Sequence, residues 1–126
     1  MKRKNCVRKY ISALVILSIA LTSISCSTAY ANIQASLPDL THKADGAYRG
    51  TQSISGTPVR ATVDVVIRNR VITSINIVEH FCSPIGKKAE RIVEKIVEQQ
   101  SLDIDVVSGA TASSKAILKA VENALQ

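Results

Sequence analysis

The stretch VRATVDVVIRNRVITSINI, residues 59–77, contains two runs in which apolar and polar residues alternate. The apolar face of the first run consists of Val59, Ala61, Val63, Val65 and Ile67. The second run follows Arg68-Asn69-Arg70 and places Val71, Thr73, Ile75 and Ile77 on one face. A period of two is typical of half-buried strands, and asparagine tolerates the left-handed backbone of a tight turn. Residues 59–77 therefore predict an antiparallel hairpin.

The residues on both sides of this hairpin complete a small fold. An extended segment over 48–54 precedes the turn-rich Ser55-Gly56-Thr57-Pro58 and predicts a third strand. Beyond residue 86, apolar residues recur at helical spacing, namely Ala89, Ile92, Val93, Ile96 and Val97. The charged residues between them, from Glu90 to Glu98, are typical of a solvated helix face rather than a docking surface.

A second helix is predicted at the end of the chain. Its apolar residues also follow helical spacing, and they are Ala116, Ile117, Ala120, Val121, Ala124 and Leu125. The expected fold class is therefore α+β, with a small antiparallel sheet of about three or more strands packed by two helices. The expected domain spans residues 45–126.

The first 31 residues have the pattern of a signal peptide. A basic start is followed by an apolar stretch over 10–24 and by the small-x-small site Ala29-Tyr30-Ala31. The protein is expected to be exported and extracytoplasmic, in a periplasm or at a cell surface, and an uncleaved membrane anchor is the alternative. A lipoprotein site at Cys26 is disfavoured, because no leucine lies three residues upstream. Residues 32–44 lack a period and are expected to form a tether.

Removal of the signal changes the charge and the cysteine count. Five of the 16 basic residues lie in it, which leaves eleven against ten acidic residues, so a nucleic-acid role is not indicated. Cys82 is the one cysteine that remains, and its commonest state would be a buried thiol. His80 and Cys82 offer too few ligands to indicate a metal site.

The sequence Asp105-Val106-Val107-Ser108-Gly109-Ala110-Thr111 precedes the last predicted helix. Gly109 and Ala110 leave the backbone nearly bare, so a large group could approach it. Unpaired amides and the helix dipole suit this helix start to a phosphate, with Ser113 and Ser114 as further donors. The alternative is that Ser108, Thr111 and Ser113 serve only as helix caps after a glycine turn.

These segments together resemble the FMN-binding domain of flavin-carrying subunits in sodium-pumping NADH:quinone oxidoreductase and related electron-transfer complexes. The resemblance covers residues 45–125 and includes Asp45-Gly46-Ala47-Tyr48-Arg49-Gly50, Gln99-Gln100-Ser101 and the complete string from Asp105 to Thr111. It implies FMN joined to Thr111 through a phosphoester, with Ser108, Gly109 and Ala110 around the phosphate. It also implies a flavin transferase, dependent on FAD and magnesium, that reads the Asp105–Thr111 string.

The loop at residues 80–86 departs from the family pattern. Many members have His-x-Glu-Thr-Pro-Gly there, in a loop that lies by the flavin. Here His80 and Pro84 fit, whereas Ser83, Cys82 and Ile85 replace the threonine, glutamate and glycine. His80 is interpreted either as a flavin-edge residue or as a surface histidine, and Cys82 either as an inert thiol or as a redox partner of the flavin.

The resulting hypothesis is an electron-transfer module with membrane or extracytoplasmic redox partners rather than a stand-alone enzyme. No catalytic residue is predicted, because no nucleophile–base arrangement emerges. Tyr48 and Phe81 are expected to pack in the core, so a covalent link would compensate for the scarcity of aromatic stacking partners. A non-covalent FMN-dependent reductase subunit and a flavin-free interaction domain are the alternatives.

Overall fold

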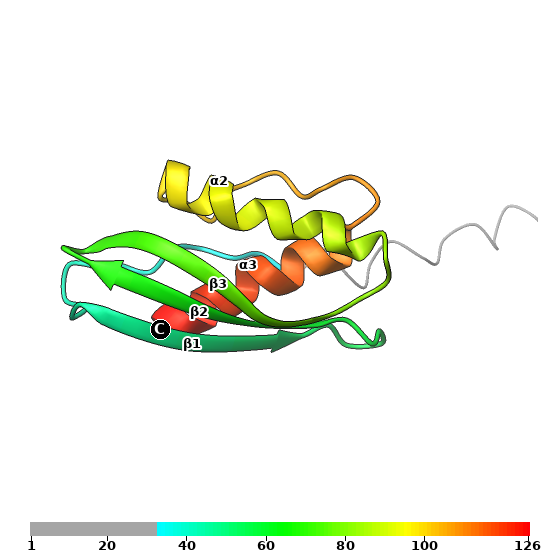
Figure 1. The fold of residues 1–126 in the computed structure, drawn as a ribbon, viewed down its shortest axis with the longest axis horizontal. Helices are drawn as coiled ribbons and strands as arrows, with labels where there is room; N and C mark the ends of the chain where they lie inside the picture. The colour runs from blue at the N-terminus through cyan, green and yellow to red at the C-terminus, as the bar shows by residue number, and fades with distance from the viewer. Residues whose placement is uncertain (1–32) are drawn as a thin grey trace, which may run out of the picture.

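The computed structural model describes residues 33–126, so the predicted signal peptide lies outside the described residues. Three antiparallel strands form one sheet in the order β1-β2-β3 (Figure 1), and their bounds are β1 (Gly46–Ser53), β2 (Arg60–Arg68) and β3 (Val71–Phe81). A short 3-10 helix, η1 (Gly86–Arg91), continues into α2 (Ile92–Gln99), and α3 (Thr111–Leu125) ends the chain. The predicted α+β fold of an antiparallel sheet and two helices is confirmed. No helix in the described part is long and apolar enough to cross a membrane.

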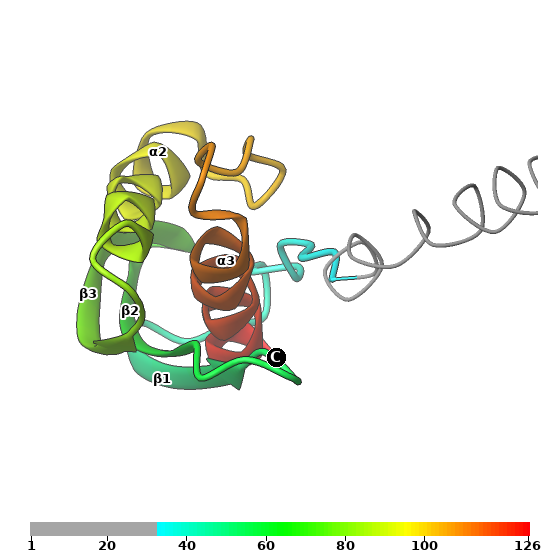
Figure 2. The ribbon, with the colours of Figure 1, turned by 90° about the vertical axis from the view of Figure 1, so that its right-hand side faces the viewer.

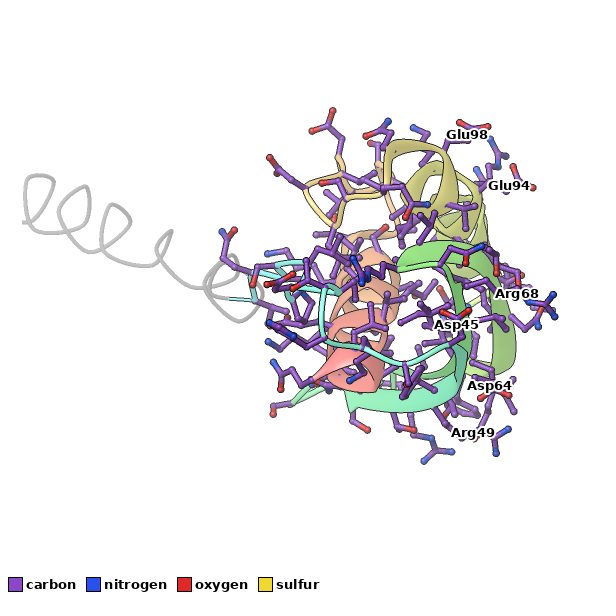
Figure 3. All side chains as sticks on the ribbon, turned by 90° about the vertical axis from the view of Figure 1, so that its left-hand side faces the viewer. Asp45, Arg49, Asp64, Arg68, Glu94 and Glu98 are labelled. Atoms are coloured by element: carbon purple, nitrogen blue, oxygen red, sulfur yellow. The ribbon has the colours of Figure 1, made fainter. Side chains whose placement is uncertain are left out.

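The helices cover one face of the sheet. Figure 2 shows α3 within the concave side of the curved sheet and α2 beside β3. The opposite face is open to solvent, and Arg49 and Asp64 form an ion pair there, with Arg49 Nε 2.6 Å from Asp64 Oδ1 (Figure 3). This arrangement follows from the alternation in β2, whose inward residues are fully buried and whose outward residues are not.

Gly50 explains how closely α3 approaches the sheet. A Cβ atom at this position would lie 2.0 Å from the carbonyl oxygen of Ala120 and 2.8 Å from the Cβ of Ala124. The small residues of α3 and the missing side chain of Gly50 therefore let helix and strand backbones touch. The close packing of α3 on β1 is therefore the structural reason for a glycine at position 50.

The predicted inner face of the third strand was wrong at its start. Val71 is 45% exposed and Thr73 is exposed, whereas Ile72 is buried at 1%. The register shows the cause, because Val66 pairs with Ser74 and Ile67 pairs with Ile72, which leaves an extra residue in β3. Such a bulge exchanges the two faces of a strand on either side of it.

The turn between β2 and β3 confirms the left-handed conformation expected at Asn69. Both Asn69 and Arg70 have positive φ, at 53° and 64°. The amide of Asn69 donates to Asp45 Oδ1 at 2.8 Å, so the start of β1 is joined to this turn. Asp45 thereby helps to fix the hairpin to its neighbouring strand.

Gln100 ends α2 in the left-handed conformation and reaches the edge of β3. Its Oε1 accepts from the amide of Ile72 at 2.9 Å, and its Nε2 donates to the carbonyl of Ile72 at 2.8 Å. The same Nε2 donates to the carbonyl of Val97 at 2.6 Å. One side chain thus closes a helix end and pairs with both backbone groups of an edge-strand residue.

The segment predicted as a tether lies against the fold within the described residues. Leu40 is buried in the core, and Ile33 and Leu37 pack against it. Lys43 Nζ donates to the carbonyl of Leu125 at 2.7 Å. Residues 33–44 contain no helix or strand, and the proposed boundary at residue 45 stays a prediction.

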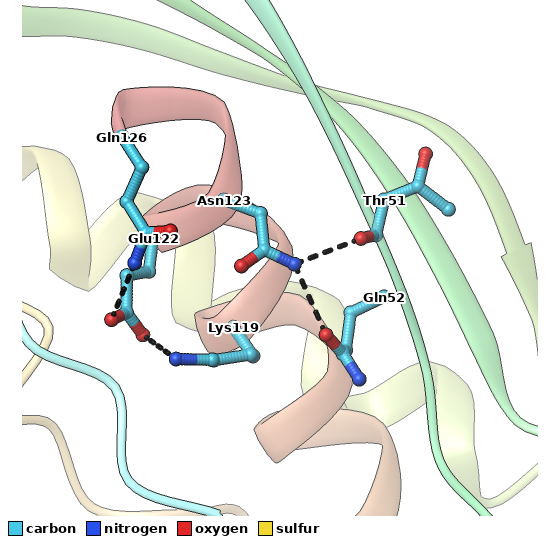
Figure 4. A network of polar contacts seen from close by, with 6 residues as sticks. All are labelled: Thr51, Gln52, Lys119, Glu122, Asn123 and Gln126. Atoms are coloured by element: carbon cyan, nitrogen blue, oxygen red, sulfur yellow. Dashed lines mark hydrogen bonds and ion pairs between the residues drawn. The ribbon is translucent and has the colours of Figure 1, made fainter.

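The last turns of α3 are joined to each other and to β1 by a polar network (Figure 4). Glu122 accepts from Lys119 Nζ at 2.6 Å and from Gln126 Nε2 at 3.1 Å. Asn123 Nδ2 donates to the carbonyl of Thr51 and to Gln52 Oε1, both at 3.0 Å. The C-terminal end of the helix is therefore held on the sheet by hydrogen bonds as well as by packing.

Candidate functional site

The start of α3 is open to a ligand. Thr111 is the first helical residue, and Ala110 occupies the cap position without a side-chain hydrogen bond. The amide of Ser114 donates to the carbonyl of Ala110, but the amides of residues 111–113 have no acceptor within residues 33–126. The first turn also contains no acidic residue. Three free amides at the positive end of a 15-residue helix form a site suited to an anion.

The turn before this helix keeps the backbone accessible. Gly109 has a φ of 78°, which glycine adopts without strain, and both Ser108 and Gly109 are exposed. The amide of Ala110 donates to the carbonyl of Val107 at 2.9 Å and closes the turn. Thr111 is partly exposed directly after this turn. The residues predicted to surround a phosphate, from Ser108 to Thr111, are therefore adjacent in space as well as in sequence.

The two following serines differ from this exposed group. The Ser114 hydroxyl is fully buried; it donates to the carbonyl of Ala110 at 2.9 Å and accepts from the amide of Val107 at 3.0 Å. Ser113 is 3% exposed. Ser114 therefore holds the turn together from inside, while contact of either serine with a cofactor stays a prediction.

The loop at residues 82–86 lies directly beside the start of α3. A Cβ atom on Gly86 would be 2.6 Å from Ser113 Oγ and 2.8 Å from the Cβ of Cys82. A Cβ atom on Gly109 would be 3.7 Å from Ile85 Cγ2. The structure thus brings together the two segments that the family resemblance associates with the flavin.

His80 lies beneath this loop and is not a surface residue. It pairs with Ala61 in the sheet register and its side chain is 2% exposed. Its Nδ1 lies 3.0 Å from Glu90 Oε1 and 3.6 Å from Cys82 Sγ, whereas its buried Nε2 has no partner. We place a hydrogen on Nδ1, where it donates to the carboxylate of Glu90.

Asp105 lies on the other side of the turn. It is exposed, as is Asp103, and both line a groove of about 250 Å³ together with Val106, Lys115 and Ile33. Asp105 therefore reaches solvent near Thr111 but belongs to a different side of the site from the loop at 82–86.

The two aromatic side chains differ in position. Tyr48 packs against the core, its hydroxyl donates to the carbonyl of Ala44 at 2.7 Å, and Lys43 Nζ lies 4.8 Å from the ring centroid. Phe81 is 57% exposed and pairs with Arg60 on the outer side of the sheet, so the expectation that it packs in the core was wrong. Its exposure follows from the position at the end of β3, where no helix covers that face.

Two residues of this site could not be recognised from the sequence. Glu90 belongs to the charged helical face in the sequence pattern, yet it contacts the buried His80. Ile85 replaces a family glycine and lies over Gly109. The positions of Glu90 and Ile85 both depend on how the 3-10 helix η1 packs against α3. No local sequence pattern predicts that packing. Within residues 33–126, no group of three or more His, Cys, Asp or Glu residues is placed to hold a metal ion.

Comparison with known proteins agrees with this geometry. The model of the FMN-binding domain family matches residues 55–126. NADH:acrylate oxidoreductase from Vibrio harveyi is 56% identical over 36 residues, which are 29% of this chain and 4% of that protein. An uncharacterized protein from Treponema pallidum (strain Nichols) is 38% identical over 84 residues, which are 65% of this chain and 23% of that protein. The chain thus spans less than a quarter of the length of either curated relative.

The family match covers more than half of the chain and includes the whole of the site. The free amides, the bare glycine turn and the lack of an acidic residue in the first helical turn fit the phosphate of a flavin mononucleotide. The chain therefore belongs to the FMN-binding domain family, and its cofactor is FMN.

Proposed function

We propose that this domain is an extracytoplasmic electron carrier that holds FMN through a phosphoester to Thr111. The single observation that carries the proposal is the start of α3, where the partly exposed Thr111 follows an exposed glycine turn and the amides of residues 111–113 have no acceptor among the described residues. A hydroxyl on a partly exposed side chain is accessible to modification. The amides then bind the phosphate that the modification introduces.

The link would be made by a flavin transferase that uses FAD and magnesium. The Thr111 oxygen forms a bond to the phosphorus of the FMN half, the pyrophosphate bond of FAD breaks, and AMP leaves while the hydroxyl proton is released. The exposed carboxylate of Asp105 is accessible to this transferase. The chain itself contributes the acceptor hydroxyl and the shape of the turn.

Bound FMN supplies the redox chemistry, as it does in flavoproteins generally. The chain contributes binding and orientation around it: the helix start binds the phosphate, and Ile85 offers an apolar surface beside the turn. The buried His80 contacts Glu90 through Nδ1 and lies next to Cys82 of the loop. Few aromatic residues are available for stacking, which favours a covalent link over tight non-covalent binding.

The intact mass of the full chain, produced in cells with and without a flavin transferase, tests the proposal. A gain of one FMN less one water, absent in Thr111→Ala and retained in Thr41→Ala, is the expected result. Thr41 is an exposed threonine outside the motif, so it is a matched control. A mass gain that persists in Thr111→Ala would place the link elsewhere and contradict the proposal. The mass of the exported form also tests cleavage after Ala31 and thereby the proposed export.

A non-covalent FMN-dependent reductase subunit is the second candidate. It is favoured by the similarity to NADH:acrylate oxidoreductase from Vibrio harveyi, although that similarity covers 4% of that protein. Yellow colour that is lost on denaturation, without a mass gain, would support this candidate. A colourless chain with an unchanged mass would instead support a flavin-free interaction domain.

A further inference from the structure

Helix η1 begins beside the start of α3 and contains three cations. Gly86 and Ala89 are the buried residues of this helix, whereas Lys87, Lys88 and Arg91 are exposed. None of these three forms an ion pair within residues 33–126. Glu90, the acidic residue of the same helix, contacts the buried His80 instead. The positive charge of η1 is therefore available to a partner.

An exposed apolar side chain lies between these cations and the glycine turn. Ile85 directly precedes η1, is 57% exposed, and lies 3.7 Å from the position of a Cβ on Gly109. This apolar side chain and the basic residues after it form one continuous segment of chain. We call Ile85, Lys87, Lys88 and Arg91 the η1 surface.

The charges on neighbouring elements do not neutralise the η1 surface. Glu79, at the end of β3, is paired with Arg60, with Arg60 Nη2 2.6 Å from Glu79 Oε1. α2 continues η1 and contains Glu94, Lys95 and Glu98, so residues 86–99 together contain four cations and three carboxylates. The exposed Asp103 and Asp105 line a separate groove together with Lys115. The η1 segment therefore keeps an excess of positive charge.

We propose that the η1 surface docks an acidic redox protein that exchanges electrons with the bound flavin. This inference rests on the proposed function. Transient electron-transfer complexes use small interfaces, and complementary charge speeds their formation more than it adds affinity. The cations would attract a partner of negative charge. Ile85 would form an apolar contact with that partner beside the Gly109 turn. The transferase, in contrast, would read the string that contains Asp105.

The test uses the double variant K87E/K88E and the control R68E/R70E. Arg68 and Arg70 are exposed and flank the turn before β3, so the control makes the same change in charge. The two sites lie at opposite ends of the 11-residue strand β3, which spans about 35 Å at the usual rise of a strand. All proteins are first flavin-loaded, and the loading is checked by intact mass.

Two probes of opposite charge are then compared by stopped-flow spectroscopy at increasing ionic strength. A reduced acidic ferredoxin donates electrons to the oxidised domain, and a basic c-type cytochrome accepts electrons from the reduced domain. We expect K87E/K88E to slow electron transfer from the ferredoxin about tenfold or more at low salt and to speed transfer to the cytochrome. The control should stay close to the wild type, and added salt should reduce the differences.

Three outcomes would overturn the docking inference. The first is equal rates in K87E/K88E and the control. The second is loss of flavin loading in K87E/K88E, which would assign the lysines to the flavin phosphate. The third is lysine-dependent binding to vesicles containing anionic lipid while the ferredoxin rate is unchanged, which would assign them to a membrane.

The inference can fail separately from the proposed function. Calorimetric titration of the unloaded protein with the acidic ferredoxin at low salt tests the η1 surface without any flavin. We expect measurable binding that K87E/K88E abolishes and R68E/R70E retains. A chain that gains no flavin but shows this pattern would contradict the carrier function and support the docking surface.

Discussion

The two ends of α3 are built in opposite ways. At the C-terminal end Asn123 is bonded to β1, and Glu122 accepts hydrogen bonds from two neighbouring side chains. At the N-terminal end Ala110 provides no cap, and three amides have no acceptor within the described residues. One end is saturated with intramolecular bonds and the other is left for a ligand. The difference shows how a small domain can keep a binding site open without loosening the helix that carries it.

The largest effect is expected from a change on the fixed side, at Gly50. In Gly50→Ala the new methyl group would lie 2.0 Å from the carbonyl oxygen of Ala120, so α3 must move away from the sheet. We expect a loss of at least about 3 kcal/mol in the free energy of unfolding, measured by urea denaturation. Gly46→Ala is the control, because its methyl group meets only Tyr48 Cε2, at 3.8 Å. Equal midpoints for the two variants would contradict the close contact.

The second-largest effect is expected at Ser114, whose buried hydroxyl bonds to the turn before α3. Ser114→Ala removes the hydroxyl that accepts from the Val107 amide, and leaves that amide without a partner. We expect a loss of about 1–3 kcal/mol in the free energy of unfolding and slower flavin attachment in a time course of intact mass. Ser108→Ala removes an exposed hydroxyl and should leave stability unchanged. If Ser114→Ala were as stable as Ser108→Ala, the role of this hydroxyl would be refuted.

A smaller effect is expected at Gly109. Comparison with Gly56 separates the strain of a positive φ from access of the flavin to Thr111. Gly109 and Gly56 have nearly equal positive φ values, 78° and 75°, and alanine at either should cost about 1 kcal/mol in stability. A methyl group on Gly109 would lie next to Ile85, whereas one on Gly56 would meet nothing within 4 Å. Only Gly109→Ala should therefore slow flavin attachment to Thr111, as followed by intact mass. Equal attachment rates in both variants would show that the bare turn is not needed.

The smallest effect is expected on the solvent-facing side of the sheet. The hydrogen bond from Arg49 lowers the pKa of Asp64 in the folded protein. The stability that this carboxylate provides is therefore present above about pH 4 and is lost as the pH falls through its lowered pKa. Asp64→Asn should lose less stability than the wild type between pH 7 and pH 3 in urea denaturation. Asp103→Asn, whose residue forms no ion pair among the described residues, should behave like the wild type.

The sequence was most informative where one local pattern decides the structure. The alternation over 59–67 gave the buried face of β2, and helical spacing gave the buried face of α3. The alternating pattern did not predict the exposure of Thr73, because the bulge there depends on the pairing of Val66 with Ser74 and leaves no mark in the sequence of β3 alone. It also could not place Phe81, since its exposure depends on which face the helices cover.

In the candidate site, too, the features set by local sequence could be predicted and those set by tertiary contacts could not. The Ser108–Thr111 string was sufficient to predict an accessible helix start, because turn, cap and helix are contiguous in the chain. The contact between Ile85 and Gly109 joins residues 24 positions apart and depends on the path of η1. The burial of His80 likewise requires the sheet register and the position of Glu90. Such contacts arise from tertiary structure, which a periodic pattern does not contain.

Gln100 has a consequence for the behaviour of the protein at high concentration. An edge strand with free amides and carbonyls is a template on which a second molecule can add a strand, and aggregation often begins in this way. The Gln100 amide occupies both backbone groups of Ile72, as a neighbouring strand would. At this point of β3 a single side chain therefore takes the place of an intermolecular partner, which protects a three-stranded sheet from growing between molecules.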